Sequence, residues 1–383
     1  MHVHKHKVLL FIPNLQQGGA ERQILELARN LPERFETTLC VWNDAVHYRE
    51  LLAEGEPRHV LGVRRMSLAG LHALEDVLAL ERPEILHSYR DKANFWARLA
   101  VRRVPVPIVL TSVRSRAMRL LYLLSEWRLS RHSDRVLTNS EGVRRELTRW
   151  ARVDASKIQV IHNFIDLERF QPPSERARTE ARAHFALGPE DLMLVVPGRI
   201  SLQKHQLGLM RSLAWLQGRG QLPAGVRIFL AGRERDRAYA WLLRRQIDGL
   251  GLGPRVVHLG AVTDHDMPRL YHAADALILP SLWEGLPNVV LEGAACGLPA
   301  IVSHAANVDG LVVEGQSGFE VPTFDRIALG RAIARMIELG EDQRRRMGAF
   351  GRAHVAAKFG PERILAETVR LYDTLLAEKG LLS

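Results

Sequence analysis

The sequence predicts an α/β protein built from two doubly wound domains with parallel sheets, and three observations support this class. Nearly continuous apolar strands alternate with amphipathic helices along the chain, which is typical of parallel sheets covered on both faces. The alternation occurs in two series, separated by a polar, proline-containing stretch near residues 164–173. The length of 383 residues also exceeds what one hydrophobic core usually supports.

The predicted strands follow this order along the chain. The first series comprises residues 7–12, 37–42, 84–89, 107–113, 135–140 and 158–163, and the second comprises residues 192–200, 226–232, 255–260, 275–281 and 299–304. The chain from about residue 325 to residue 381 reads as helical. We therefore expect an N-terminal domain at 1–170, a C-terminal domain at 171–360 and a final helix at 361–383. Ligands of such sheets bind at the carboxyl ends of strands, so the cleft between two facing domains is the expected site.

Composition argues against a membrane-spanning or a disulfide-rich protein, and the charge leaves several kinds of anionic partner open. Hydrophobic residues make up 46% and charged residues 25%, as in an ordinary soluble protein, and no stretch is long enough to span a membrane. Cys40 and Cys296 give neither a disulfide framework nor a metal cluster, so we expect a cytoplasmic protein. The net charge of +10 indicates an anionic partner: nucleic acid, a phosphorylated small molecule or anionic lipid.

The stretch "PNLQQGGAER" places Gly18 and Gly19 between the end of a strand and a helix that begins near Ala20. Glycines at such a point let backbone N–H groups approach a phosphate or oxyanion, and the helix dipole favours the anion. A plain turn is the alternative. The spacing is not GxGxxG, which disfavours a nicotinamide or flavin site.

The stretch "VVPGRISLQKHQ" follows the first strand of the second series and contains Arg199 and Lys204. A planar guanidinium followed by a mobile ammonium suits a diphosphate. Two solvated surface charges are the alternative, although the position directly after an apolar strand favours a binding role.

The stretch "EGLPNVVLE" carries Glu284 in a loop and Glu292 eight positions later on a predicted helix. Pro287 is well placed in the first turn, and the free amides there can bind an anion. A carboxylate accepts hydrogen bonds, so each acid can hold the paired hydroxyls of a sugar. The alternative is an incidental loop acid and a solvated helix residue. Apolar neighbours make an unpaired charge at Glu292 costly, however.

These motifs together resemble family 4 retaining glycosyltransferases, which have the two-domain GT-B fold. The resemblance rests on "GGAER", "GRISLQKH", "LYHAADALILPSLWEGLPNVVLEGAACGLPAIVS" and the acid pair Glu284-x7-Glu292, in order over nearly the whole chain. It implies that the C-terminal domain binds a nucleotide-sugar donor and that the last helix packs on the N-terminal domain.

The resemblance also implies residue roles. Arg199 and Lys204 would hold the diphosphate, Glu292 the ribose hydroxyls, and Glu284 a sugar hydroxyl near the anomeric carbon. Gly18 and Gly19 would contact the donor from the other domain. Backbone amides would line the sugar and phosphate at Gly285, Leu286, Asn288 and Val289. We expect Arg199, Lys204 and Glu284 to be the catalytic residues, and Arg199→Ala and Lys204→Ala to lose turnover with little loss of fold.

No metal or other cofactor is expected, because fixed cations and helix-start amides can stabilise the charge that grows on the departing diphosphate. The string "DHD" at Asp264–Asp266 follows Thr263 and reads as a helix cap rather than a metal site. The family implies retention by same-face attack, with Glu284 as a covalent nucleophile as the minority alternative.

Acceptor contacts are expected on the N-terminal domain, at His87 and Arg114. The family often has His-x-His here, but this chain has Tyr89 at the second position, so a structural histidine is an equal alternative. The stretch 114–135 mixes arginines with leucines and Trp127. It could lie on an anionic membrane at the inner face of the cell membrane, or pack its apolar face into the core.

The expected function is metal-independent, retaining transfer of a sugar from a nucleotide-sugar to a lipid-linked, lipopolysaccharide or polysaccharide acceptor. One alternative is a nucleotide-sugar epimerase of the same fold, which the acid pair and the basic stretch disfavour. The other is a basic nucleic-acid-binding protein, although the sequence contains no recognisable nucleic-acid module, and we expect no nucleic-acid partner.

Overall fold

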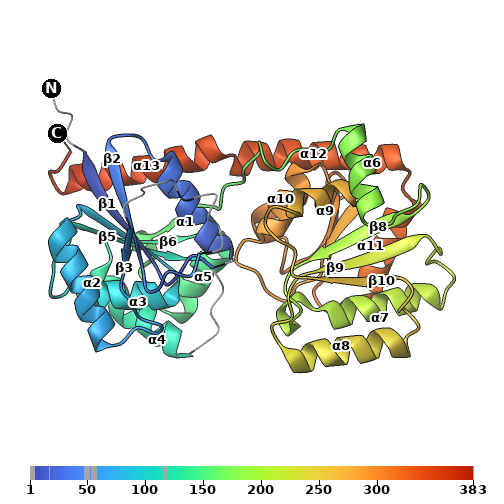
Figure 1. Cartoon of the computed structure of the whole chain (residues 1–383), viewed down its shortest axis with the longest axis horizontal. Helices are drawn as coiled ribbons and strands as arrows, with labels where there is room; N and C mark the ends of the chain where they lie inside the picture. Colours follow the sequence, from blue (N-terminus) through green and yellow to red (C-terminus); the bar gives the residue numbers. More distant parts are fainter. Residues whose placement is uncertain (1–4, 17, 47–51, 53–57, 115–119, 383) are drawn as a thin grey trace. The chain divides into compact units, whose positions relative to one another are not determined.

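The structure, a computed structural model, describes residues 5–16, 18–46, 52, 58–114 and 120–382. The chain divides into two compact units (Figure 1). The N-terminal unit comprises Met1–Phe164 and Glu362–Ser383, and the C-terminal unit comprises Ile165–Pro361. The last helix therefore belongs to the N-terminal unit, although it follows the C-terminal unit in sequence.

The N-terminal unit contains a parallel sheet with the strand order β3-β2-β1-β4-β5-β6-β7. Its strands are β1 (His6–Ile12), β2 (Phe35–Val41), β3 (Arg58–Val60), β4 (Ile85–Tyr89), β5 (Ile108–Val113), β6 (Arg135–Thr138) and β7 (Ile158–Val160). All six strands predicted in this half are present. The short edge strand β3 was not predicted, because "RHV" carries little apolar signal.

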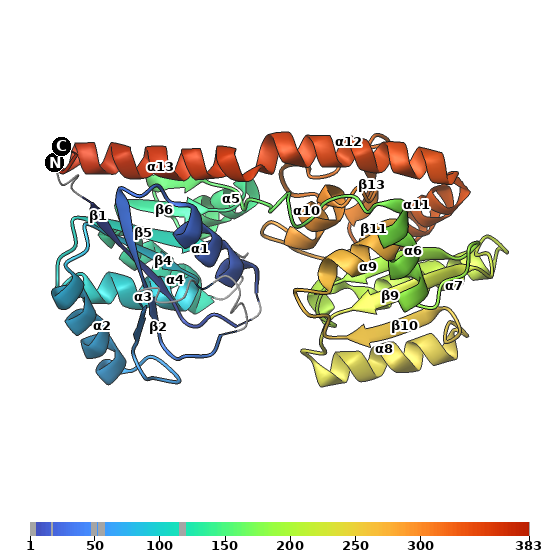
Figure 2. The same ribbon diagram turned by 45° about the horizontal axis from the view of Figure 1, so that its top comes forward.

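Helices cover both faces of this sheet (Figures 1 and 2). They are α1 (Gly19–Asn30), α2 (Leu68–Glu81), α3 (Asp91–Ala100), α4 (Leu120–Leu129), α5 (Glu141–Trp150) and α13 (Pro361–Glu378). One apolar core joins the sheet to α1 and α13, and a second joins its other face to α2 and α3. A smaller cluster joins α4 and α5 to β5, β6 and β7. The coverage of both faces explains why the strands are apolar without alternation.

The C-terminal unit repeats the plan with the strand order β10-β9-β8-β11-β12-β13, again parallel throughout. Its strands are β8 (Leu192–Pro197), β9 (Val226–Ala231), β10 (Val256–Gly260), β11 (Ala276–Leu279), β12 (Ala300–Ser303) and β13 (Gly318–Val321). The five strands predicted in this half are present. The edge strand β13 was not predicted, because its four residues are too few to show a pattern.

The helices of the C-terminal unit also lie on both faces of its sheet. They are α6 (Glu175–His184), α7 (Gln206–Gln217), α8 (Arg237–Gly249), α9 (Met267–Ala273), α10 (Asn288–Ala295), α11 (Arg326–Glu338) and α12 (Glu341–Phe359). One core contains residues of α6, α9, α10 and α12, and the other contains residues of α7, α8 and α11.

In each sheet the chain adds strands first toward one edge and then toward the other. The change occurs between β1 and β4 in the first unit and between β8 and β11 in the second. In a doubly wound sheet the loops after two such strands leave in opposite directions and open a crevice at the carboxyl ends, where ligands bind. In the C-terminal unit, the expected ligand site therefore lies at the loops that follow β8 and β11.

Candidate active site

The loop after β8 contains Arg199 and Lys204, and the loop after β11 contains Glu284. The two strands are hydrogen-bonded neighbours. The loops are joined as well, because the backbone N–H of Leu282 donates to the Gln203 carbonyl at 2.8 Å. Three residues predicted from two separate motifs thus lie on the two sides of one topological switch point.

Gly198 makes room for the Lys204 side chain. Its φ of +136° lies outside the range of ordinary side chains, and a Cβ there would lie 2.8 Å from the Lys204 Cε. Gly232, after β9, is equally constrained, because a Cβ there would lie 2.1 Å from the Gly198 carbonyl oxygen. The two glycines let adjacent backbones and the lysine stem pack closely at the carboxyl edge of the sheet.

Lys204 and Glu284 form a buried ion pair. The Lys204 Nζ lies 2.7 Å from the Glu284 Oε1, and the two residues are 9% and 8% exposed. Gln203 fixes the same loop, because its side-chain amide donates to the Trp283 carbonyl at 3.0 Å and to the Glu284 Oε2 at 3.4 Å. The lysine and the acid, predicted to hold different parts of a ligand, therefore act on each other directly.

Glu292 lies on the buried face of α10 and is 8% exposed. The hydroxyl of Tyr271, on α9, donates to its Oε2 at 2.8 Å. The negative charge of Glu292 is also felt at Cys296, whose pKa is raised mainly by burial and further by this carboxylate. The structure thus excludes the solvated-residue alternative for Glu292, and the Tyr271 hydroxyl contributes to satisfying its charge.

The helix that links the two acids begins as expected, with one shift. Pro287 is the N-cap of α10 rather than its first helical residue, and the Val290 N–H donates to its carbonyl at 3.0 Å. Gly285 and Leu286 are buried, whereas Asn288 and Val289 are half-buried at the helix start. Arg199 is also half-buried, and its carbonyl accepts from the Gln206 side chain at 3.0 Å.

Sequence reasoning missed three residues of this site: Gln203, Tyr271 and Ser281. Ser281 lies two residues after the end of β11 and is fully buried, and its hydroxyl has no hydrogen-bond partner within the described chain. A serine after a strand gives only a weak signal. Tyr271 reads as an ordinary core residue of an amphipathic helix, because its acidic partner lies on another helix.

The string Asp264–Asp266 has structural roles. Thr263 and Asp266 bond reciprocally at the start of α9, with the Asp266 N–H donating to the Thr263 hydroxyl at 3.2 Å. Asp264 forms an ion pair with Arg169. In the described ranges, no group of three or more His, Cys, Asp or Glu residues could hold a metal ion.

In the N-terminal unit, Gly18 is the N-cap of α1 with extended backbone. A Cβ there would lie 2.2 Å from the Glu21 Oε2, so the glycine makes room for that carboxylate. Glu21 forms an ion pair with Arg90, which follows β4. The first turn of α1 therefore already carries an anion.

His87, which the sequence left open as either an acceptor or sugar contact or a structural histidine, lies inside the N-terminal unit. Its side chain is fully buried, and its ring nitrogens lie 2.7 Å from the Tyr372 hydroxyl and 2.8 Å from the Ser112 hydroxyl. Burial, with the nearby Arg114 charge, holds its pKa well below the ordinary value. A neutral, fully bonded imidazole inside the unit has no free nitrogen for a ligand.

Arg114, after β5, is held by neutral groups. Its guanidinium donates to the Asn163 Oδ1 at 2.7 Å and to the Tyr89 hydroxyl at 3.4 Å, and lies 4.9 Å from the centre of the Tyr89 ring. No described carboxylate pairs with it. The position of the expected second histidine, Tyr89, thus serves to orient this cation.

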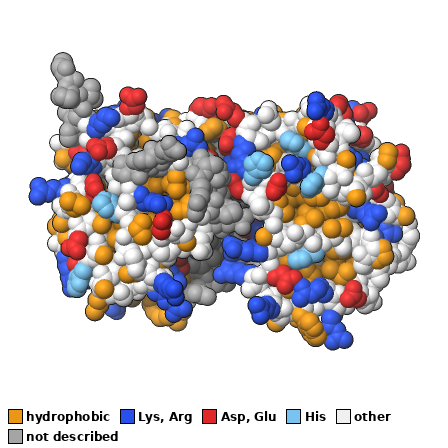
Figure 3. Space-filling model, in the orientation of Figure 1, with side chains coloured by type: hydrophobic (Ala, Val, Ile, Leu, Met, Phe, Trp, Pro, Cys, Tyr) orange, Lys and Arg blue, Asp and Glu red, His pale blue; other side chains and the backbone are white. Residues whose placement is uncertain are grey.

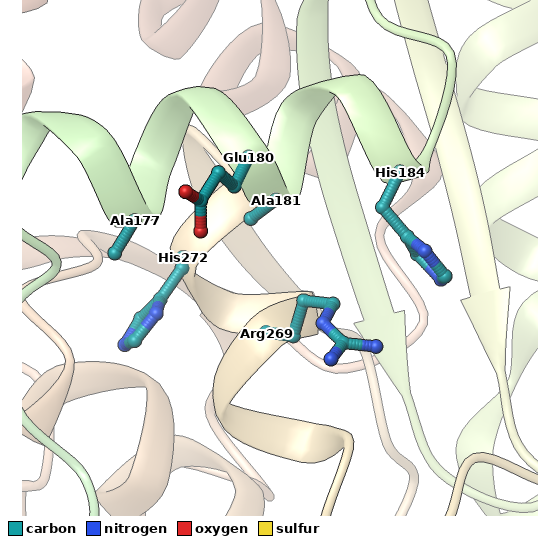
Figure 4. A pocket seen from close by; sticks show the side chains of 6 residues that line it. All are labelled: Ala177, Glu180, Ala181, His184, Arg269 and His272. Atoms are coloured by element: carbon teal, nitrogen blue, oxygen red, sulfur yellow. The ribbon is translucent and has the colours of Figure 1, made fainter.

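A separate surface pocket lies between α6 and α9 (Figure 4). It is lined by Ala177, Glu180, Ala181, His184, Arg269 and His272. None of these is a predicted site residue, and the pocket lies on a helical layer rather than at the loops after β8 and β11. None of the described helices is long and apolar enough to cross a membrane.

Comparison with known proteins gives two family matches and several relatives. The family described as Glycosyltransferase Family 4 matches residues 17–169, and that described as Glycosyl transferases group 1 matches residues 177–354. The UDP-Gal:alpha-D-GlcNAc-diphosphoundecaprenol alpha-1,3-galactosyltransferase of Escherichia coli is 26% identical over 281 residues, covering 71% of this chain and 70% of that protein. The D-inositol 3-phosphate glycosyltransferase of Salinispora tropica is 27% identical over 400 residues, covering 94% and 82%.

Among solved structures, Anabaena Alr3699/HepE in complex with UDP and glucose has a TM-score of 0.84 at 21% identity, covering 96% of this chain and 100% of that chain. This likeness shows the fold, in agreement with the two parallel sheets. The family matches lie one on each unit and confirm the resemblance drawn from the motifs. The chain therefore belongs to the family 4 type of glycosyltransferases, sugar-transferring enzymes with the GT-B fold.

Proposed function

We propose that this enzyme is a retaining, metal-independent glycosyltransferase that moves a sugar from a nucleotide-sugar to a lipid-linked, lipopolysaccharide or polysaccharide acceptor. The main support for this proposal is that Lys204 and Glu284 lie in contact at the switch point of the C-terminal sheet. The second acid of the pair, Glu292, is buried on the helix that follows. Cations and hydroxyl-binding acids so placed suit a nucleotide-sugar.

The diphosphate of the donor would be held by Arg199 and Lys204. An ammonium has three protons, so Lys204 can keep one bond to Glu284 and offer others to a phosphate oxygen. This shared use also solves an electrostatic problem. The ion pair neutralises Glu284, which would otherwise repel the diphosphate bound beside it.

The two acids would bind hydroxyl groups. Glu284 would accept from a hydroxyl of the donor sugar through Oε2, because Oε1 faces Lys204. Glu292 would accept from the ribose hydroxyls, with the Tyr271 hydroxyl orienting its carboxylate. The amides of Gly285, Leu286, Asn288 and Val289 would line the sugar and phosphate.

In the proposed reaction the bond between the anomeric carbon and the diphosphate oxygen breaks, and a bond from the same face to the acceptor oxygen forms. The departing phosphate oxygen takes the acceptor's proton. Charge grows on the diphosphate as the bond breaks, and Arg199, Lys204 and the start of α10 would stabilise it. Glu284 is assigned hydroxyl binding rather than nucleophilic attack, because its ion pair with the Lys204 ammonium reduces the negative charge that its carboxylate can offer to a carbon atom.

Arg114 is the residue we propose for the acceptor. Its guanidinium is fixed by neutral partners, so its charge is available to an anion such as an acceptor phosphate. The Escherichia coli relative is named for a diphosphate-linked lipid acceptor, which supports an anionic acceptor here. Gly18 and Gly19 remain proposed donor contacts. We propose a cytoplasmic location at the inner face of the cell membrane.

The donor assignment is tested by the melting temperature with UDP, GDP, ADP, CDP and their sugars, all in EDTA. A ligand that binds only the folded chain at one hundred times its Kd stabilises it by about 2.7 kcal/mol. For a unit of this size that corresponds to a rise of roughly 5–10 °C. One nucleotide should give this rise without metal. No rise with any of them, or a rise only with Mg²⁺, would contradict the proposal.

Retention is tested separately, by proton NMR of the first product formed from the stabilising donor. The anomeric coupling constant of the product should match that of the donor. An inverted anomer would refute same-face attack while leaving the donor assignment intact.

A further inference from the structure

Helix α4 buries a charged side chain and exposes several apolar ones, unlike an ordinary surface helix. Its inward positions carry Tyr122 and Glu126, which are 8% and 1% exposed. A surface helix normally buries its apolar face and presents charges to water. The sequence suggested either that arrangement or a helix lying on a membrane. The structure shows Leu120, Leu121 and Leu124 facing outward, whereas Leu123 packs against the core.

The buried acid is anchored by a buried arginine. The Glu126 Oε1 lies 2.8 Å from a terminal guanidinium nitrogen of Arg98. Arg98 belongs to α3, and its side chain is fully buried. The same guanidinium donates to the Ser133 hydroxyl at 2.9 Å and to the Thr111 hydroxyl at 2.8 Å. Removing one partner of such a pair leaves an uncompensated buried charge. The pair therefore holds the polar face of α4 inward.

The outward face of α4 is apolar. Leu120, Leu121, Leu124 and Trp127 are 71%, 83%, 44% and 47% exposed. Positions 120, 124 and 127 follow helical spacing, so these side chains form one stripe. Hydrophobic side chains lie on the surface at the lower edge of the N-terminal unit in Figure 3, where Figure 1 draws α4. A grouped apolar stripe, unlike a single exposed leucine, indicates an interaction surface.

Cations lie at the carboxyl-terminal end of this stripe. Arg128 is exposed and stacks on Trp127, and Arg131 is exposed in the next turn. The pKa of His132 is lowered, first by desolvation and then by the charges of Arg131, Arg102, Arg98 and Lys157, which shows that these cations are gathered here.

The acids of this region do not offset these cations at the surface. Between Arg98 and Arg135 the chain contains two acids, Glu126 and Asp134. Glu126 is buried, and Asp134 pairs with Lys379 at 2.9 Å.

We infer that the outer face of α4 is a docking surface for an anionic lipid bilayer. Leucines would enter the headgroup boundary, Trp127 would lie at the interface, and the arginines would meet lipid phosphates. The charge next to the stripe favours this occupant over a second copy of this basic chain. The inference deepens the proposed function and rests on it for its biological purpose, because a lipid-linked acceptor is found at a membrane.

Sedimentation of the full chain with vesicles tests the surface. Wild-type protein should bind phosphatidylglycerol vesicles, bind phosphatidylcholine vesicles at least about tenfold more weakly, and release in high salt. Leu121→Glu combined with Leu124→Glu should weaken binding at least about tenfold. The control is Leu242→Glu on α8, where Trp241 and Leu242 are 51% and 48% exposed; it should bind as wild type does.

A fluorescent label gives a second readout. Both native cysteines, Cys40 and Cys296, are buried and free, so a dye should attach selectively to an introduced thiol. An environment-sensitive dye on Leu121→Cys should shift to the blue with phosphatidylglycerol vesicles, and the same dye on Leu242→Cys should not. A shift only at position 242 would overturn the inference.

The outcomes separate this inference from the proposed function. Failure of wild type to bind vesicles, or wild-type binding by the double variant, would refute the bilayer surface. If wild type is a dimer in solution and the double variant is a monomer, the stripe is a self-association surface and the inference is wrong. Neither result touches the donor site, because nucleotide-induced stabilisation is measured without lipid and should be equal in both proteins.

Discussion

Replacing one partner of the Lys204–Glu284 pair should destabilise the C-terminal unit, and replacing both should restore part of the loss. The charges lie 2.7 Å apart on side chains that are 11% and 8% exposed, so water screens them little. At an effective dielectric constant of about 20 their attraction is roughly 6 kcal/mol, of which desolvation offsets a large part. We expect Lys204→Met or Glu284→Gln to cost about 3 kcal/mol each, with a coupling of about 2 kcal/mol in the double variant.

The assay is thermal unfolding of the four proteins at neutral pH. About 3 kcal/mol corresponds to a fall in Tm of roughly 6–12 °C for a unit of this size. This revises the expectation from sequence that Lys204→Ala would spare the fold; for the half-buried Arg199 that expectation stands. Effects that add within about 0.5 kcal/mol would refute the buried pair.

Three further predictions concern single residues. Because burial lowers the pKa of His87, the unfolded chain binds a proton below pH 6.5 that the folded chain does not, so stability should fall on acidification. His87→Gln should reduce that slope by up to about 1.4 kcal/mol per pH unit, measured as Tm against pH, and an unchanged slope would contradict the neutral buried ring. Gly198→Ala should abolish nucleotide-induced stabilisation by displacing Lys204, whereas Gly220→Ala, with φ of +67° and open space around it, should keep it. Glu292→Gln should bind the donor nucleotide about tenfold more weakly and lose the preference for ribose over deoxyribose, so a retained preference in calorimetry would exclude the ribose role.

Patterns within short stretches predicted most of the fold. Strands such as Leu192–Pro197 are apolar without interruption because both faces of the sheet are covered. The edge strands β3 and β13 were not predicted, because segments of three or four residues are too short to show a periodic pattern of apolar residues. The candidate site residues of the C-terminal unit were predicted for the same local reason, since glycines, cations and acids follow shortly after apolar strands.

Contacts between distant residues could not be read from the sequence. The partners Lys204 and Glu284 are 80 positions apart, and His87 and Tyr372 are 285 apart. The orientation of α4 was equally hidden, because leucines are expected to face inward. It depends on the Arg98–Glu126 pair, which only the packed unit reveals.

In the proposed reaction, the group around Lys204 on the C-terminal unit activates a nucleotide-sugar. Release of nucleoside diphosphate from the stabilising donor, measured in EDTA without acceptor or lipid, tests this activation. We predict slow release by the wild type. Lys204→Met, assayed below its own Tm, should release nucleoside diphosphate at least about a hundredfold more slowly. Arg269→Met, in the pocket between α6 and α9, should release it at the wild-type rate. Release by Lys204→Met at the wild-type rate, or no release by wild type, would contradict the proposed activation.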